Sequence, residues 1–348
     1  ARKMAAYLQS QGVQKGDHVA LVSKNCAEWI IADLSIWMAG AVSVPLYPTL
    51  VAETVRQIME HSESKFLFVG KLDDWDIMKG GVPDGVKQVA FTLAPRDALN
   101  DFPNWGDIIR DTAPLEQVAE PAMEDIATII YTSGTTGNPK GVVYHHRGAY
   151  LNASSNIIGW NLGHHPTYLW TLPMFHCNGW CFPWSLAAVG GTSVCLRNVS
   201  ASAIFDAIAD YGVTHFCGAP VVLNLIINAT ESETRDFDHT VEVMTAAAPP
   251  PAAVLAAMES AGFAMTHVYG LTETYGPAVI CAWHPEWNAL KPAERAEIKS
   301  RQGVPYHMLE DLKVLDPQTM NSVNPDASQL GEVMFRGNIV MKGYLKNP

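Results

Sequence analysis

Apolar residues in the first two thirds of the chain follow two alternating patterns. Short continuous apolar runs, typical of buried strands, alternate with longer stretches whose apolar residues recur at helical spacing. Strands are therefore expected at 18–22, 41–45, 66–69, 213–217, 242–245 and 264–268. Helices are expected at 27–38, 51–61, 203–211, 221–228 and 252–261. This alternation predicts an α/β fold in which crossover helices join parallel strands.

Two regions depart from the alternation. Residues 73–121 are rich in turn-forming Gly and Pro, and we expect them to form a surface excursion. After residue 302, strand-like runs at 312–315, 332–336 and 339–341 follow one another without helices, which indicates a small β-rich subdomain. We therefore expect a first α/β subdomain at 1–165, a second at 166–295 and the β-rich one at 296–348.

Composition and charge narrow the functional classes. The 348 residues carry a formal net charge of −12, so the chain lacks the excess of Lys and Arg that broad binding to nucleic acid or anionic membrane requires. Six scattered cysteines do not form a disulfide framework, which predicts reduced thiols and a cytoplasmic location. Residues 166–196 contain no charged side chain, but their Pro, Gly, His and Asn residues argue for a buried segment of a soluble protein rather than a membrane span.

Ligands of parallel sheets gather where the strands end at their carboxyl side. Three of the predicted strands end in Gly218-Ala219-Pro220, in residues 246–249 and in residues 269–273. Small residues at two of these ends leave room for a flat group, and the third supplies an aromatic ring, a hydroxyl and a carboxylate. This arrangement suits a nucleotide.

A glycine- and hydroxyl-rich string lies between strand-like runs at 126–130 and 142–144. It reads Tyr131-Thr132-Ser133-Gly134-Thr135-Thr136-Gly137-Asn138-Pro139-Lys140-Gly141. Its glycines allow backbone N–H groups to point at an anion, its hydroxyls add donors, and Lys140 adds a positive charge for phosphate oxygens. Gly141 stands where a Walker motif needs Ser or Thr, which disfavours a P-loop kinase or NTPase. The alternative is an ordinary hairpin turn.

This string resembles the phosphate-binding loop of the adenylate-forming superfamily of acyl-CoA synthetases, luciferases and nonribosomal adenylation domains. The resemblance extends over nearly the whole chain, through 35–45, the His-containing segment 173–180, residues 269–274 and the Gly- and Tyr-containing segment 331–344. It implies the large N-terminal domain of that fold, with two parallel-rich sheets and a β-rich subdomain. The family's C-terminal domain and hinge are expected to be absent, which predicts impaired adenylation by this chain.

The resemblance also implies a nucleotide site. The ATP phosphates would be held by Thr132, Ser133, Gly134, Thr135, Thr136, Gly137 and Lys140. Adenine would lie between Tyr269 and the backbone of Ala247, Ala248 and Pro249, next to Gly270; Ala246 and Ala247 replace glycines of many relatives, so this slot is expected to be tighter. His267 would bond the adenine edge, although a structural His and a core Tyr269 are the alternatives. Thr272 would contact the α-phosphate, and Glu273 would bind Mg²⁺.

The acid site is implied by the His-containing segment. His176 would lie between the nucleotide and acyl pockets and contact the carboxylate, so Lys140, His176, Thr272 and Glu273 form the expected catalytic set. Trp180 and Gly218 would line the acid pocket, where a wide indole favours a short- or medium-chain acid. In an alternative, His176, Cys177 and Cys181 bind a metal, but they lack a fourth partner at zinc spacing.

The implied reaction joins a carboxylate to ATP, giving acyl-adenylate and pyrophosphate, and CoA then releases the acyl-CoA and AMP. Segment 279–287 and residues 301–304 resemble a branch that contains plant acyl-activating enzymes and bacterial ligases of 3-methylmercaptopropionate, a product of dimethylsulfoniopropionate breakdown. The expected partners are thus a small acid, ATP, Mg²⁺ and CoA, without nucleic acid or membrane, and a homodimer is allowed. The alternatives are a non-catalytic nucleotide-binding module and an adenylate-forming enzyme with another acceptor or with a fatty or aromatic acid.

Overall fold

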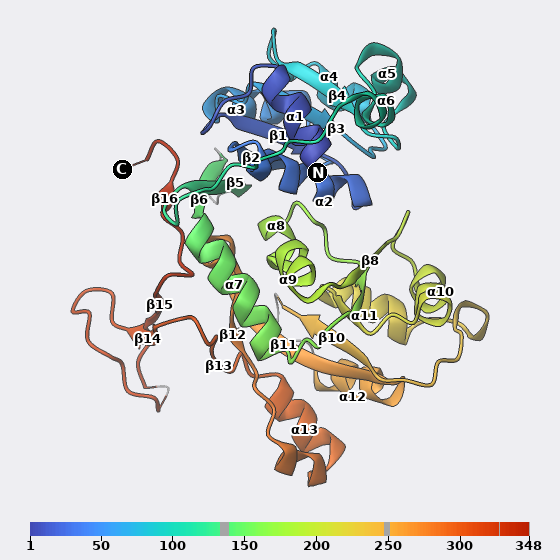
Figure 1. Cartoon of the computed structure of the whole chain (residues 1–348). Helices are drawn as coiled ribbons and strands as arrows, with labels where there is room; N and C mark the ends of the chain where they lie inside the picture. Colours follow the sequence, from blue (N-terminus) through green and yellow to red (C-terminus); the bar gives the residue numbers. More distant parts are fainter. Residues whose placement is uncertain (133–138, 247–250, 327, 348) are drawn as a thin grey trace.

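The computed structural model describes residues 1–132, 139–246, 251–326 and 328–347. Two seven-stranded sheets, both flanked by helices, make up most of the molecule, and a separate two-stranded ladder lies beside them (Figure 1). The expectation of two parallel-rich sheets and a small β unit is confirmed.

The first sheet combines a parallel centre with an antiparallel edge. Its strand order is β16-β6-β5-β2-β1-β3-β4, and its members are β1 (His18–Val22), β2 (Val42–Leu46), β3 (Phe66–Val69), β4 (Lys87–Ala90), β5 (Ile126–Thr132), β6 (Lys140–His145) and β16 (Gly343–Tyr344). Strands β5, β2, β1, β3 and β4 pair in parallel. The hairpin β5–β6 pairs Thr132 with Lys140, and β16 adds an antiparallel strand to β6.

The second sheet has the same organisation. Its order is β13-β12-β11-β10-β9-β7-β8, and its members are β7 (Thr167–Trp170), β8 (Thr192–Cys195), β9 (His215–Cys217), β10 (Val241–Thr245), β11 (Phe263–Leu271), β12 (Gly276–Ile280) and β13 (Val304–Pro305). Strands β8, β7, β9, β10 and β11 run in parallel, whereas β12 and β13 are antiparallel additions. The separate ladder consists of β14 (Asp311–Leu315) and β15 (Glu332–Arg336).

Helices cover both sheets. Those associated with the first sheet are α1 (Arg2–Ser10), α2 (Ala27–Met38), α3 (Ala52–His61), α4 (Trp75–Lys79), α5 (Arg96–Asp101) and α6 (Trp105–Asp111). The others are α7 (His146–Gly159), α8 (Cys177–Trp180), α9 (Phe182–Val189), α10 (Ala201–Tyr211), α11 (Pro220–Ile227), α12 (Ala252–Ser260) and α13 (Pro292–Lys299), with single 3₁₀ turns at Glu231–Glu233, Thr272–Thr274 and Pro285–Ala289.

Burial on both faces explains why the central strands are continuously apolar. In β1, Val19 and Leu21 point into a core that also contains Trp170 and Met244 of the second sheet. Ala20 and Val22 point to the opposite core, beneath α3 and α4. Because side chains alternate between faces, a strand covered on both sides needs apolar residues at every position. The first of these cores joins the two sheets.

Two sequence expectations were wrong. The strand expected at 339–341 does not form, and residues 343–344 make the strand instead. The region 73–121 is no mere surface excursion, because β4 completes the first sheet and Trp105 is buried against Phe91. Besides the separate ladder, residues 296–348 contribute β13 to the second sheet and β16 to the first.

The uncharged segment 166–196 folds as β7, α8, α9 and β8, and most of it is buried. Across the described ranges, every helix is too short or too polar to cross a bilayer.

Candidate active site

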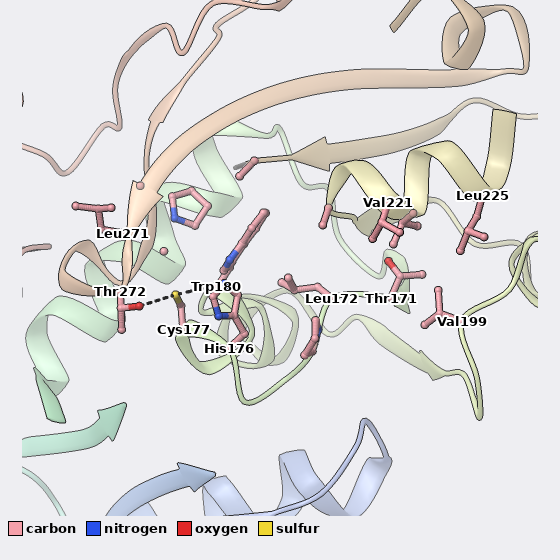
Figure 2. A pocket seen from close by; sticks show the side chains of 17 residues that line it. Thr171, Leu172, His176, Cys177, Trp180, Val199, Val221, Leu225, Leu271 and Thr272 are labelled. Atoms are coloured by element: carbon pink, nitrogen blue, oxygen red, sulfur yellow. Dashed lines mark hydrogen bonds between the residues drawn. The ribbon is translucent and has the colours of Figure 1, made fainter. Parts of the chain in front are cut away.

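A largely apolar cavity of about 740 Å³ opens at the carboxyl ends of β9, β10 and β11 (Figure 2). Ala219, Ala246 and Thr272 line it, so the three strand ends picked out in the sequence do meet. Figure 2 also shows Val221 and Leu225 of α11 projecting into the cavity. Among the described residues that line it, none is an Asp, Glu, Lys or Arg. Such a wall suits the apolar part of a small ligand.

One wall of the cavity is a left-handed turn. All five residues from Cys177 to Cys181 have a positive φ, between 44° and 66°. Each non-glycine residue in this conformation costs about 1–2 kcal/mol, so the surrounding structure has to hold the turn in place. The buried carboxylate of Asp33 accepts hydrogen bonds from Asn178 Nδ2 at 3.3 Å and Trp184 Nε1 at 3.0 Å. It also accepts one from Ser43 Oγ at 2.6 Å, which ties the turn to the first sheet.

His176 directly precedes this turn and lines the cavity. Its Nδ1 lies 3.3 Å from the hydroxyl of Tyr47, whose ring packs against Phe175. Burial lowers the pKa of His176 below its ordinary 6.5, so the imidazole is neutral at pH 7. A neutral imidazole at this place can donate or accept a hydrogen bond without adding charge to the apolar cavity.

Cys177 lies beside His176, with its Sγ 3.5 Å from Thr272 Oγ1 (Figure 2). Burial raises the pKa of this thiol to about 12. A thiol that stays protonated is a poor nucleophile, so the cavity offers no thiolate for covalent catalysis.

Trp180 lines the cavity, and Ala219 rather than Gly218 stands at the wall beside it. The indole of Trp180 packs on Gly276, where an added Cβ would lie 3.1 Å from Trp180 Cδ1. Gly218 has its N–H bonded to the carbonyl of Met244 and faces Val222.

Lys140 and Glu273 both lie beside the Tyr344 side chain. The Tyr344 hydroxyl donates a 2.8 Å hydrogen bond to Glu273 Oε1, and Lys140 Nζ lies 5.2 Å from the centre of the same ring. The phosphate-loop hairpin and the end of β11 are therefore adjacent in space. Lys140 is exposed and Glu273 half-buried, as ligand-binding charges must be to reach a ligand.

The backbone beside Glu273 is firmly held. The Thr272 carbonyl accepts a 2.6 Å hydrogen bond from the hydroxyl of the buried Tyr144, and the Met341 N–H donates to the Glu273 carbonyl at 2.7 Å. Thr272 thus borders the apolar cavity while its chain neighbour Glu273 faces the charged side. The turn at Thr272–Glu273 therefore joins the apolar cavity to the side that carries Lys140 and Glu273.

The adenine-side residues are arranged along β11. The half-buried Tyr269 stacks on Phe335 of β15, with ring centroids 6.1 Å apart. At Gly270 a Cβ would lie 1.8 Å from the Gly276 carbonyl, so a glycine is needed for this close approach of two strands. His267 is buried, and its Nδ1 lies 3.0 Å from the Arg301 carbonyl. This contact occupies one ring nitrogen and supports the alternative in which His267 has a structural role.

Several predicted ligand-binding residues lie outside the described residues: Ser133, Gly134, Thr135, Thr136, Gly137, Ala247, Ala248 and Pro249. Thr132, the last residue of β5, is described and lies half-buried opposite Lys140. The structure therefore describes the residues on either side of the predicted phosphate loop.

No group of three or more His, Cys, Asp or Glu side chains capable of holding a metal occurs in the described ranges, including the alternative set His176, Cys177 and Cys181. A Mg²⁺ ion that bridges phosphates needs few protein ligands and keeps several waters. The single carboxylate of Glu273 fits that kind of site, in which most ligands come from the nucleotide and water.

Sequence reasoning missed three residues that shape the site: Asp33, Tyr47 and Tyr344. Tyr47 directly follows β2, and an inspection of every strand end would have found it. Asp33 gave one signal, a carboxylate flanked by apolar residues in the middle of a helix. Tyr344 was noticed only as part of a motif, and its contact with Glu273 arises from a strand that pairs across the sheet edge.

An uncharged cavity thus adjoins a pair of opposite charges at the turn Thr272–Glu273. The sequence model of the AMP-binding enzyme family matches residues 1–345. The chain belongs to the AMP-binding enzyme family.

Two plant relatives show how the chain compares with longer proteins. The acetate/butyrate–CoA ligase AAE7 of Arabidopsis thaliana, named as peroxisomal, is 44% identical over 366 residues, covering 100% of this chain and 64% of the plant protein. The 2-methylpropanoate–CoA ligase CCL4 of Humulus lupulus is 43% identical and covers 99% and 64%. The chain spans about 64% of the length of these relatives.

Solved structures show that this chain has the fold of the N-terminal domain of adenylate-forming enzymes. The N-terminal domain of FACL13 from Mycobacterium tuberculosis superposes with a TM-score of 0.83 at 24% identity, covering 100% of this chain and 82% of that one. The O-succinylbenzoate CoA synthetase MenE from Bacillus subtilis, solved with ATP and magnesium ion, gives a TM-score of 0.77 at 25% identity, covering 99% and 66%.

Proposed function

We propose that the chain is the nucleotide- and acid-binding part of an ATP-dependent acid–CoA ligase. The reaction forms an acyl-adenylate and pyrophosphate from a carboxylate and ATP, and CoA then takes the acyl group and releases AMP. The observation that carries the proposal is the turn at Thr272–Glu273, which joins an uncharged cavity to a pair of opposite charges.

The chemistry of the first step fits these residues. Attack of a carboxylate on the α-phosphorus needs alignment and neutralisation of charge rather than a nucleophilic side chain. Lys140 can hold phosphate oxygens, and Thr272, which reaches both halves of the site, can hold the α-phosphate near the acid. Glu273 would hold Mg²⁺, which supplies neutralisation of the phosphate charge. The neutral His176 can orient the acid carboxylate at the mouth of the cavity.

The cavity supports a short- or medium-chain acid. Trp180 occupies part of its wall, and Leu172, Val221 and Leu225 add aliphatic surface. The names of the plant relatives, which specify acetate, butyrate and 2-methylpropanoate, point to acids of this size.

Within this class we favour 3-methylmercaptopropionate as the acid to test first. Its thioether can make favourable sulfur contacts with an aromatic ring, and Trp180 offers one inside the cavity. Its length lies between those of butyrate and hexanoate. A cytoplasmic location and action on free acid, ATP and CoA complete the proposal, and tagging with a fluorescent protein tests the location against the peroxisome.

A panel of acids tests the function. Pyrophosphate release is measured with acetate, butyrate, 2-methylpropanoate, 3-methylmercaptopropionate, hexanoate and benzoate, both on this chain and on the longest protein that its gene encodes, and CoA thioesters are detected by mass spectrometry. In the longest protein, the expected result is acid-dependent pyrophosphate release that Lys140→Ala abolishes, while Lys65→Ala, directly before β3, leaves it intact. Release of ADP, or nucleotide binding by the longest protein without any acid-dependent product, would overturn the proposal.

A further inference from the structure

Lys140 and Glu273 are opposite charges on neighbouring elements, yet they do not pair with each other. Neither belongs to any ion pair of the described residues. The residues outside the described ranges are Ser, Gly, Thr, Asn, Ala and Pro, whose side chains carry no charge that could pair with either. Both groups interact with the side chain of Tyr344.

Tyr344 is fixed in this place by the sheet. Its residue pairs with Val142, and antiparallel register puts Lys140, two residues before Val142, on the same face and diagonal to Tyr344. The Lys342 N–H bonds to the Val143 carbonyl at 2.9 Å, and the Leu345 N–H bonds to the Gly141 carbonyl at 2.7 Å. Backbone bonds on both sides therefore hold the ring where it stands.

The ring of Tyr344 interacts with Lys140, and its hydroxyl interacts with Glu273. The electron-rich ring face lies under the Lys140 ammonium, and the hydroxyl donates to the Glu273 carboxylate.

We infer that Tyr344 is a positioning residue that holds Lys140 and Glu273 apart, so that the ammonium stays free for phosphate oxygens and the carboxylate for a metal. The inference rests on the proposed function, because it concerns the same nucleotide site. The side chain of Lys140 is long and flexible, and without the ring it can turn toward Glu273. The resulting ion pair would neutralise both groups, and ATP would have to break it before binding.

Metal-free ATP binding isolates this effect. Titration calorimetry in EDTA measures the Kd of ATP for this chain and for Tyr344→Phe, Tyr344→Ala and Tyr344→Leu, each with and without Glu273→Gln. The Phe variant keeps the ring, so its Kd stays within about twofold of the wild type. Ala and Leu remove the ring and weaken binding about three- to fivefold, the scale of a partly exposed ion pair. Adding Glu273→Gln restores binding to the Kd of Glu273→Gln alone.

Controls separate the possible failures. Tyr150→Ala, which removes an exposed tyrosine of α7, is expected to leave the Kd unchanged. Thermal unfolding identifies variants that do not fold. If Tyr344→Ala does not fold, Tyr344→Leu serves as the variant without the ring. A wild-type chain that fails to bind ATP contradicts the proposed function. If the wild type binds through Lys140 but Ala and Leu bind equally well, or if Glu273→Gln fails to restore their binding, the role assigned to Tyr344 is wrong.

Discussion

The hydroxyl of Tyr47 lies 3.3 Å from Nδ1 of His176 and links the end of β2 in the first sheet to the mouth of the acid cavity. Tyr47 also packs on Phe175, so its ring has a fixed place independent of the hydrogen bond. Burial raises the pKa of Tyr47 to about 12, which keeps the phenol protonated at every physiological pH. The contact fixes the orientation of the imidazole at the cavity wall.

Replacing Tyr47 by Phe removes this hydrogen bond and keeps the ring packing. We expect KM for the acid to rise by up to about tenfold, the value of one hydrogen bond, with the KM for ATP unchanged. Pyrophosphate exchange at varied acid and ATP concentrations measures both. Tyr211→Phe, at an exposed position of α10, is the matched control. An equal rise in both KM values would show that Tyr47 supports the fold rather than His176.

Replacing Trp180 by Ala enlarges the cavity and shifts the preference toward longer acids. Two added methylenes that enter the new space contribute about 1.6 kcal/mol, so the ratio of kcat/KM for hexanoate over butyrate is expected to rise about tenfold. Overall stability falls by about 3–5 kcal/mol because a buried indole is lost. The indole of Trp37 does not line this cavity, and Trp37→Ala is expected to leave the ratio unchanged. An unchanged ratio in Trp180→Ala would place the acid elsewhere.

Replacing Asp33 by Ala leaves the donors of Asn178 and Trp184 buried without an acceptor. The free energy of unfolding is expected to fall by about 2–5 kcal/mol. Asp33→Asn keeps one acceptor oxygen and an amide that can donate to Ser43, so its loss should be smaller. Urea unfolding measures both. Equal losses in the two variants would mean that the carboxylate does not hold the left-handed turn.

Stability is expected to fall at acidic pH, in part because of His215. Burial lowers the pKa of this imidazole from 6.5 to about 4, while the unfolded chain retains the ordinary value. Between these values the unfolded state binds more protons, so the contribution is fully present above pH 6.5 and is lost as the pH falls toward 4. The loss is on the order of 3 kcal/mol. Buried His176 and His267 add to it in the same direction.

The variant His215→Asn tests this contribution, because its amide can keep a bond to Thr214, whose Oγ1 lies 2.8 Å from His215 Nδ1. Urea unfolding at pH 7.5 and pH 5 should show a smaller loss in this variant than in the wild type. The control variant His164→Asn, at an exposed position, should lose as much stability between the two pH values as the wild type. If stability falls as much between pH 7.5 and pH 5 in His215→Asn as in the wild type, the assignment of this loss to His215 is wrong.

The sequence predicted the central elements because their apolar patterns are local. The helix expected at 27–38 and the strands expected at 18–22 and 66–69 have the bounds of α2, β1 and β3. The meeting of the strand ends at Ala219, Ala246 and Thr272 was also predictable, because parallel topology fixes which ends share an edge. These parts follow from short-range pattern and a general rule of sheet geometry.

Other parts depend on contacts that no local pattern reports. Residues 343–344 form a strand only because β6 offers an unpaired edge two hundred residues earlier in the chain. Asp33 in α2 became part of the site through Asn178, on a turn whose left-handed backbone no propensity predicts. Gly218 was assigned to the acid pocket by resemblance, whereas its neighbour Ala219 lines the cavity of the structure.

The pairing of β16 with β6 also affects how the protein is made. While synthesis proceeds, β6 carries an open row of backbone donors and acceptors at the edge of a sheet whose other strands have already left the ribosome. Exposed strand edges of this kind recruit other chains. The part of this edge at Val142 and Val143 is therefore covered only once Gly343 and Tyr344 have been made.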